Sequence, residues 1–403
     1  MKVILSTLGP LHLIKSAEYL SKLVDIRVIQ GMLPSWWNRW MIGLASKIQH
    51  RDISKTIKKR TPDCLNGRNV GLTIPDVYYW ACRMFRIATP QHASMKSAAL
   101  FGRLQKRYLR NADIYHVRSG SGAEGAIKVA KDRGMKVVVD HSIAHPAFMD
   151  ANLKSEFQKN NATFTLGLDN PFWREIVNEC EQADILLVNS NFVKDTFVCQ
   201  GYDENKIRVA YLGVRQDFFS LKTDYSADQK LRILFTGGFG FRKGAEYILL
   251  ALCELDKLGI PYEATIVGNA SEAQSLLKRI TPLHINLVNT VPQSELKTFL
   301  ANSDVYLFPS LCEGCASSGM EAMAAGLPVI ATAESGLPIT NGKNGIIVDA
   351  RCVKQIVDAL LRLQESEQLR RQLGQAAAQL IRNNYTWEKY AENVAHIYEE
   401  LIH

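Results

Sequence analysis

Short, almost uniformly apolar runs alternate with longer amphipathic stretches along nearly the whole chain. Uniformly apolar runs are typical of parallel strands buried on both faces of a sheet, and the stretches between them predict covering helices. This alternation is the βαβ rhythm of doubly wound α/β domains. We expect strands at residues 3–6, 25–29, 113–116, 136–140, 184–189 and 208–211, and then at residues 232–236, 264–267, 286–288, 305–308 and 329–331.

A polar, aperiodic stretch at residues 215–230 separates the two series of strands. Because 403 residues exceed one ordinary hydrophobic core, we predict two Rossmann-like domains facing across a cleft, residues 1–214 and 215–386. The last stretch, residues 387–403, has apolar positions at helical spacing and predicts a helix that completes the first domain. Between residues 31 and 110 strand and helix signals mix, and no elements are predicted there.

Composition bounds the class of protein. The chain is 47% hydrophobic and 22% charged, and no apolar run approaches the roughly 18–20 residues of a membrane span. The opening residues read as a strand instead of a secretion signal, and the eight scattered cysteines suit a reducing compartment. We therefore expect a cytoplasmic protein. The net charge of +8 is a mild bias that is compatible with nucleic acid, anionic lipid or phosphorylated substrates.

One basic stretch changes this picture. Residues 31–60 contain seven Lys or Arg, the single acid Asp52 and three of the six tryptophans. Aromatic and cationic side chains together predict peripheral contact of residues 36–60 with an anionic membrane, on its inner face. The alternative is a basic face on an otherwise buried helix. Nucleic-acid binding is disfavoured because the cations cluster with tryptophans outside any recognised module.

The expected strand at residues 232–236 runs into a glycine-rich turn. Its glycines include Gly238 and Gly240, and Arg242 and Lys243 follow immediately before a predicted helix. Glycines allow close backbone approach, a helix N-terminus favours an anion, and the two cations add charge, so the segment predicts a diphosphate cradle. The alternative is a plain turn with solvated basic residues. The spacing is neither a dinucleotide fingerprint nor a P-loop.

The expected strand at residues 305–308 leads to two glutamates, Glu313 and Glu321, separated by small residues. Carboxylates accept hydrogen bonds from sugar hydroxyls and loop amides donate them, so this segment suits a polyhydroxylated ligand. Either glutamate could instead face solvent or cap a helix. Cys312 and Cys315 have CxxC spacing, but the second ligand pair of a metal site and a thioredoxin-like context are missing from the sequence.

The Glu313-x7-Glu321 pattern, followed by residues 322–331, resembles the signature of GT-B glycosyltransferases of family 4, the retaining glycosyltransferase group 1. The basic turn at Arg242, the end of the expected strand at Val267 and the Ser190 segment agree with the family in order and spacing. The resemblance covers about residues 180–400 well and the first 110 residues only through architecture.

The resemblance implies retaining transfer of a sugar from a UDP- or GDP-sugar donor, with no cofactor or metal required. It implies that Glu313 meets the donor sugar and Glu321 the ribose, while Arg242 and Lys243 neutralise the leaving diphosphate. The backbone of Ser318, Gly319 and Met320 would lie beside the sugar and the diphosphate. The sequence departs from the family where an Arg is usual, at Gly238, and where an aromatic residue and a glycine are usual, at Cys315 and Ala316.

The first domain would bind the acceptor, a glycan or lipid-linked molecule of cell-surface polysaccharide biosynthesis. The family often has a His at the end of the expected strand at residues 136–140, and His141 aligns best with it. His145 is the other candidate for this position. Each of the two could be a core or capping histidine instead. The segment at Gly9 follows the first expected strand, where the family has a glycine-rich loop beside the diphosphate. Arg118 and His116 could meet an acceptor phosphate or be plain surface residues. Alternatives are a nucleotide-sugar epimerase, a phosphorylase, or a catalytically silent sugar-nucleotide-binding scaffold.

Overall fold

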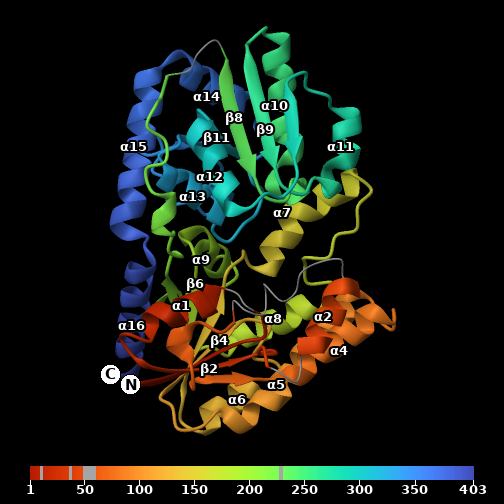
Figure 1. Ribbon diagram of the computed structural model, residues 1–403, viewed down its shortest axis with the longest axis vertical. Coiled ribbons are helices and arrows are strands. Elements are labelled where there is room, and N and C mark those ends of the chain that lie inside the picture. The colour runs from red at the N-terminus through yellow and green to blue at the C-terminus, as the bar shows by residue number, and fades with distance from the viewer. Residues whose placement is uncertain (10–11, 36–38, 49–59, 227–229) are drawn as a thin grey trace.

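The computed structural model describes residues 1–9, 12–35, 39–48, 60–226 and 230–403. It contains two parallel β-sheets, each with helices on its faces, and the two layered bodies lie one above the other (Figure 1). The predicted α/β class with two Rossmann-like domains is confirmed. All eleven predicted strands are present, with ends shifted by one or two residues.

The first sheet has seven strands in the order β3-β2-β1-β4-β5-β6-β7, and all its pairs are parallel. The strands are β1 (Lys2–Thr7), β2 (Asp25–Gln30), β3 (Asn69–Gly71), β4 (Ile114–Arg118), β5 (Lys136–His141), β6 (Ile185–Val188) and β7 (Ile207–Val209). Its helices are α1 (His12–Leu20), α2 (Arg39–Ile48), α4 (Thr73–Met84), α5 (Pro90–Gln105), α6 (Ala126–Asp132), α7 (Pro146–Lys159), α8 (Pro171–Glu181) and α9 (Asn191–Val198). The strand order reverses between β1 and β4, the point at which such sheets bind ligands.

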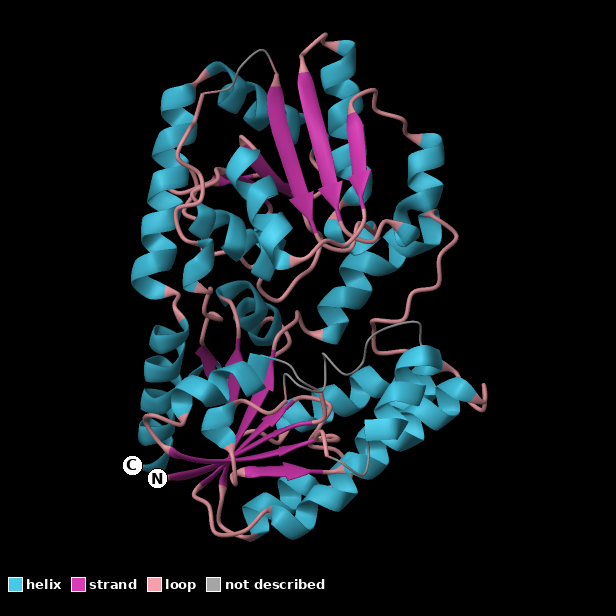
Figure 2. Cartoon of the chain, in the orientation of Figure 1, coloured by secondary structure: helices cyan, strands magenta, loops and turns pink. Residues whose placement is uncertain are grey.

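The second sheet has six strands in the order β10-β9-β8-β11-β12-β13. They are β8 (Leu231–Thr236), β9 (Tyr262–Val267), β10 (Ile285–Val288), β11 (Val305–Phe308), β12 (Val329–Ala331) and β13 (Ile346–Ile347). Their helices are α10 (Ala245–Lys257), α11 (Gln274–Arg279), α12 (Gln293–Asn302), α13 (Ser317–Ala325), α14 (Val353–Glu365) and α15 (Glu367–Asn384). The arrowheads of β8, β9 and β10 point toward the first sheet (Figure 2), so the loops after these strands face it.

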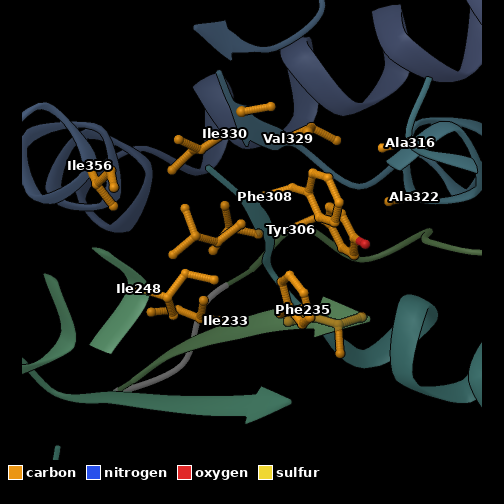
Figure 3. Packing of buried hydrophobic residues seen from close by; sticks show 14 of the residues in the cluster. Ile233, Phe235, Ile248, Tyr306, Phe308, Ala316, Ala322, Val329, Ile330 and Ile356 are labelled. Carbon is orange, nitrogen blue, oxygen red and sulfur yellow. The ribbon is translucent and has the colours of Figure 1, made fainter. Parts of the chain in front are cut away.

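Aromatic rings fill the core of the second sheet. Phe308 on β11 stacks on Phe235 of β8, with ring centroids 5.5 Å apart, and on Tyr306 at 6.0 Å. The close-up shows these rings beside Ile330 and Ala322 of the neighbouring elements (Figure 3). This packing holds the carboxyl end of β11, and thus the segment that carries Glu313, against β8.

Two helices pack on a sheet other than the one that their place in the chain suggests. The last helix, α16 (Trp387–Ile402), packs on α1, and its Tyr390, Val394 and Tyr398 are buried in a core cluster of the first sheet. In the opposite direction, α7 precedes β6 in the chain, yet its Met149 and Leu153 are buried in the core cluster of the second sheet. Figure 1 shows α7 between the two sheets.

Candidate active site

The turn after β8 depends on glycine. Gly244 has φ +75°, and a Cβ at this position would lie 2.1 Å from the carbonyl oxygen of Pro309. Because only glycine tolerates both the backbone and the contact, the turn can lie directly against the segment after β11. The carbonyl of Arg242 accepts hydrogen bonds from the amide of Leu311, at 2.9 Å, and from the hydroxyl of Ser310, at 3.1 Å. The turn and the Glu313 segment therefore form one unit.

Arg242, Lys243 and Glu313 meet in this unit. Arg242 Nη1 lies 2.6 Å from Glu313 Oε1 and also donates to the carbonyl of Cys312 at 2.7 Å. Lys243 Nζ lies 3.6 Å from the same carboxylate oxygen and 5.0 Å from the centroid of the Phe308 ring. Burial opposes the charge on Arg242, but the Glu313 carboxylate raises the pKa of the guanidinium above its ordinary value. Both cations therefore lie at one oxygen of Glu313, and a second carboxylate, Glu272, also acts on Arg242.

The N-terminus of α13 adds hydrogen-bond donors beside the Glu313 loop. Ser318, Gly319 and Met320 lie in its first turns, and the N-cap residue Ala316 offers no side-chain cap. First-turn amides have no intrahelical acceptor, and a helix N-terminus carries partial positive charge. The amide of Met320 already donates to the carbonyl of Ala316 at 2.9 Å. Ser318 and Gly319 are therefore the predicted residues whose amides are placed where an anion can bind. The amides and the two cations together suit a diphosphate.

Glu321 lies further along α13, outside the ion cluster. Its charged neighbours are Arg215 and Asp217, at the entry to the second sheet. Burial raises the pKa of Glu321 to about 7, so the group is partly protonated at neutral pH. A half-buried carboxyl of this kind gains a compensating partner when hydroxyl groups donate to it.

The two predicted glycines of the turn differ. A Cβ at Gly240 would lie 2.3 Å from Glu272 Oε1, the same oxygen that accepts from the amide of Phe241 at 2.7 Å. A side chain at Gly240 would therefore have to displace the carboxylate of Glu272 from the Phe241 amide. At Gly238 no described atom lies within 4 Å of the Cβ position, so the backbone is open to a ligand there.

A cavity of about 530 Å³ opens at the carboxyl ends of β9 and β10, and sequence reasoning did not identify it. Gly268 and Asn269 follow β9, Asn289 follows β10, and Lys278 of α11 closes one side. The rule that ligands lie beyond the strand ends, applied to these two strands, could have found it.

At the first sheet, Asp140 is the centre of a buried charge network that sequence reasoning missed. His12 Nε2 lies 2.9 Å from its carboxylate, Arg118 Nη1 lies 2.9 Å away, and His116 Nε2 lies 3.8 Å away. Burial would raise the pKa of Asp140, but these neighbours lower it well below its ordinary range. The surface alternative for His116 is wrong, because this residue is fully buried and its Nδ1 contacts the hydroxyl of Tyr398.

The two candidate histidines occupy different settings. His141, at the end of β5, is buried with Nδ1 2.9 Å from the Ser119 hydroxyl, and burial followed by the charge of Arg118 lowers its pKa to about 3. His145 caps α7, because its Nδ1 accepts from the amide of Ala147 at 3.1 Å. Burial lowers the pKa of His145 to about 4, so both rings are neutral at pH 7.

The loops of the two sheets touch beside Glu313. A Cβ at Gly314 would lie 2.0 Å from the carbonyl oxygen of Ser142, the residue after His141. Ser190, at the N-cap of α9, donates its hydroxyl to the carbonyl of Gly314. The structure therefore brings the segments of His141 and Glu313 together. Gly9 lies after β1, and its carbonyl accepts from Thr7 at 3.0 Å.

The predicted membrane stretch is only partly visible, since residues 36–38 and 49–59 lie outside the described residues. Within it, Trp40 of α2 is 68% exposed. The prediction that the cations of residues 36–60 contact a membrane is wrong for Arg60. Its side chain is buried and pairs with Asp76 at 2.8 Å, because a buried cation requires a partner. Arg60 is therefore not a surface cation. Among the described residues no helix is long and apolar enough to cross a membrane.

The CxxC residues are buried and free. Cys312 is fully buried and Cys315 is 8% exposed. Burial raises the pKa of Cys312 to about 12 and that of Cys315 also well above its ordinary value, so both thiols are protonated at neutral pH. Within the described parts of the chain, no group of three His, Cys, Asp or Glu side chains is placed to hold a metal ion.

Residues 220–380 match the sequence family described as "Glycosyl transferases group 1". This stretch holds the whole second sheet together with Lys243, Glu313 and Glu321, so these residues lie in a glycosyltransferase group 1 domain. The amylovoran biosynthesis glycosyltransferase AmsK of Erwinia amylovora is 31% identical over 198 residues, which are 46% of this chain. The matched region spans about half of that relative, 49% of its length.

Solved structures resemble the whole chain. Sucrose-phosphate synthase of Thermosynechococcus elongatus matches with a TM-score of 0.70 at 15% identity, covering 100% of this chain and 99% of the other. Anabaena Alr3699/HepE, solved in complex with UDP and glucose, has a TM-score of 0.61 at 14% identity and covers 99% of this chain and 100% of its own. At such identities the likeness concerns the fold, and the predicted GT-B architecture is confirmed.

Proposed function

We propose that this chain is a retaining glycosyltransferase that moves a sugar from a nucleotide donor, a UDP- or GDP-sugar, to a glycan or lipid-linked acceptor. The proposal depends mainly on the Arg242–Lys243–Glu313 cluster, which lies beside the N-terminus of α13, a helix end without a side-chain cap. The two cations and the amides of Ser318 and Gly319 fit a diphosphate, and the Glu313 carboxylate fits sugar hydroxyls. The group 1 match of residues 220–380 supports the same reaction class.

In this mechanism the bond between the anomeric carbon and the diphosphate oxygen breaks. The acceptor hydroxyl forms the new glycosidic bond on the same face, and its proton leaves with the nucleoside diphosphate. Lys243 and Arg242 stabilise the negative charge that develops on the leaving oxygen, a role that a metal ion fills elsewhere. Glu313 then exchanges its contact with Arg242 for the sugar hydroxyls. No cofactor is required.

We also assign the nucleoside of the donor to the second sheet. We assign the ribose to Glu321 and the base to the cavity at the ends of β9 and β10. The sugar-bearing end of the donor then reaches the loops where Ser142 meets Gly314, beside His141. The neutral His141 ring would line the acceptor side. A solved relative of the same fold holds UDP and glucose, which favours UDP as the first donor to test.

The test is a screen of UDP-, GDP- and ADP-sugars, read by thermal shift and by released nucleotide, with Glu313→Ala beside the wild type. We expect one donor to stabilise both proteins and to be hydrolysed slowly by the wild type alone. Binding without any turnover by the wild type favours the silent scaffold, and release of an epimerised donor favours the epimerase. Absence of binding by every nucleotide sugar contradicts the proposal.

We also place the chain at an anionic membrane, where a lipid-linked acceptor resides, through the tip of the α4–α5 hairpin. Residues Arg83 to Ile87 at this tip are all exposed, with Phe85 66% and Ile87 69% accessible. Arg83 and Arg86 flank Phe85 at the tip. Residues 77–112 carry seven Lys or Arg and no Asp or Glu, and four of these cations, within residues 103–110, lie at the far end of α5. Apolar side chains among cations suit the headgroup layer of an anionic bilayer.

Co-sedimentation with vesicles checks this surface. The wild type is expected to bind phosphatidylserine-containing vesicles at low salt and not neutral phosphatidylcholine vesicles. Phe85→Ser with Ile87→Ser should release it, whereas Leu283→Ser, which removes a 75% exposed leucine next to the second sheet, should not. Equal binding of the hairpin variant and the wild type would overturn the assignment.

A further inference from the structure

Helix α7 links the two halves of the candidate site. It begins just after the His141–His145 segment of the first sheet, and its far end lies on the turn that carries Arg242 and Lys243. Phe157 of α7 packs edge-to-face on Phe241, with ring centroids 5.3 Å apart. Phe241 directly precedes Arg242. A shift of Phe157 would therefore be transmitted to the two cations through one buried ring.

A buried carboxylate fixes this end of α7. Glu156 is 6% exposed, and its Oε1 accepts from the Tyr247 hydroxyl of α10 at 2.7 Å and from Arg351 Nε at 2.7 Å. Arg351 also donates to the carbonyl of Asn152, one turn earlier on α7. Both donors belong to the second sheet's elements, so the contact joins residues far apart in the chain.

The remaining contacts of α7 agree with this anchoring. Met149 and Leu153 are fully buried in the second sheet's core cluster, and Lys159 pairs with Glu246 of α10 at 2.8 Å. A helix buried on one body while its first residue follows a loop of the other behaves as a rigid spacer between them, because packed interiors resist small displacements.

We propose that Glu156 and Phe157 are positioning residues of the donor site: through Phe241 they hold the Arg242–Lys243 turn at a set distance from the His141 segment. The inference rests on the proposed function for its catalytic consequence. Neither residue touches the substrate. They act by keeping the leaving-group cations and the acceptor side in register when the donor is bound.

The test compares Glu156→Leu, which leaves the Tyr247 hydroxyl and Arg351 without their acceptor, with Glu156→Gln, which keeps an oxygen acceptor of the same shape. The control is Asp256→Leu, since Asp256 accepts from the Tyr262 hydroxyl at 2.9 Å entirely within the second sheet's elements. Misplacement of reacting groups by about 1 Å can cost up to about a hundredfold in rate, so we expect kcat of transfer to fall at least about tenfold in Glu156→Leu.

The affinity for the nucleoside diphosphate should remain within about twofold of wild type, and Glu156→Gln should restore most of kcat, since the cations themselves are intact. A fall in kcat no larger than that of Asp256→Leu, or a parallel loss of affinity, would overturn the proposal. Amide hydrogen exchange supplies a readout without activity. Faster exchange at residues 240–245 in Glu156→Leu but not in Asp256→Leu supports the role, and equal exchange contradicts it. A wild type that binds no donor would refute the proposed function while leaving this readout intact.

Discussion

Each sheet ends in a charge cluster, and the two clusters differ in burial and in composition. At the first sheet one carboxylate, Asp140, contacts Arg118 and His12 and is 4% exposed, with His116 Nε2 3.8 Å away. At the second sheet two cations, Arg242 and Lys243, lie at the same oxygen of Glu313, partly exposed and next to the N-terminus of α13. A network buried around one carboxylate stabilises a fold, whereas two partly exposed cations beside a helix N-terminus are accessible to an anion. Under the proposed function, the first cluster stabilises the fold and the second stabilises the charge on the leaving diphosphate.

The largest expected effect tests the second cluster. Lys243→Ala removes a cation from the developing negative charge and should lower kcat of donor turnover by about 10²–10³-fold, the usual cost of one electrostatic stabiliser. The melting temperature should change little, because Glu313 keeps its contact with Arg242. Steady-state kinetics and thermal unfolding measure the two. A loss of less than about threefold in kcat would place the leaving group elsewhere.

The second prediction concerns the first cluster, where we expect a large loss of stability instead of a loss of kcat. Asp140→Asn takes the negative charge from a residue that is 4% exposed and leaves Arg118 without its counter-charge. Breaking one partner of a buried ion pair costs about 3–5 kcal/mol, and we expect about 3 because the amide oxygen still accepts hydrogen bonds. Urea unfolding checks this against Glu313→Gln, for which we expect less than about 1 kcal/mol. Similar losses in both variants would remove the distinction between the clusters.

The third prediction concerns Glu321 and pH. Its folded-state pKa is about 7, above the ordinary value of 4.5, so the folded chain binds the proton more tightly than the unfolded chain. The contribution is neutral below pH 4.5 and becomes unfavourable as pH rises from 4.5 to about 7. At pH 8, Glu321→Gln should therefore be more stable than wild type by on the order of 2–3 kcal/mol, with little difference at pH 4.5.

Denaturant unfolding of wild type and Glu321→Gln at pH 4.5, 6 and 8 measures this effect. The variant should at the same time bind the nucleotide more weakly, because the neutral amide accepts more weakly from the ribose hydroxyls. A stability difference that is independent of pH would show that Glu321 has no raised pKa.

The two halves of the chain also differ in how much of their structure could be predicted from the sequence. The strands were predictable because each is a short apolar run buried on both faces. Glu313 could be located because it lies in the loop after one of them, and Glu321 because it lies in the helix that follows this loop. The two missed strands are β3 and β13, of three and two residues, too short for a pattern to emerge. Residues 31–110, where no elements were predicted, contain α2, α4 and α5.

Long-range contacts account for what else was missed. The Asp140 network joins residues up to 128 positions apart, and α7 is packed on a sheet that its sequence position does not indicate. Periodicity reports local burial, but it does not report which surface covers a buried face. The donor-side residues lie within about 80 positions of one another on one sheet edge, so strand order alone brought them together.

Calorimetric titration of UDP and GDP tests the central claim most directly, with wild type, Arg242→Ala/Lys243→Ala and Asp140→Asn compared at one ionic strength. We predict that one nucleotide binds the wild type with a single site, that the double cation variant loses at least about tenfold in affinity, and that folded Asp140→Asn binds like wild type. Equal affinity of the cation variant and the wild type, or absence of binding by either nucleotide, would contradict the assignment of the donor diphosphate to the second sheet.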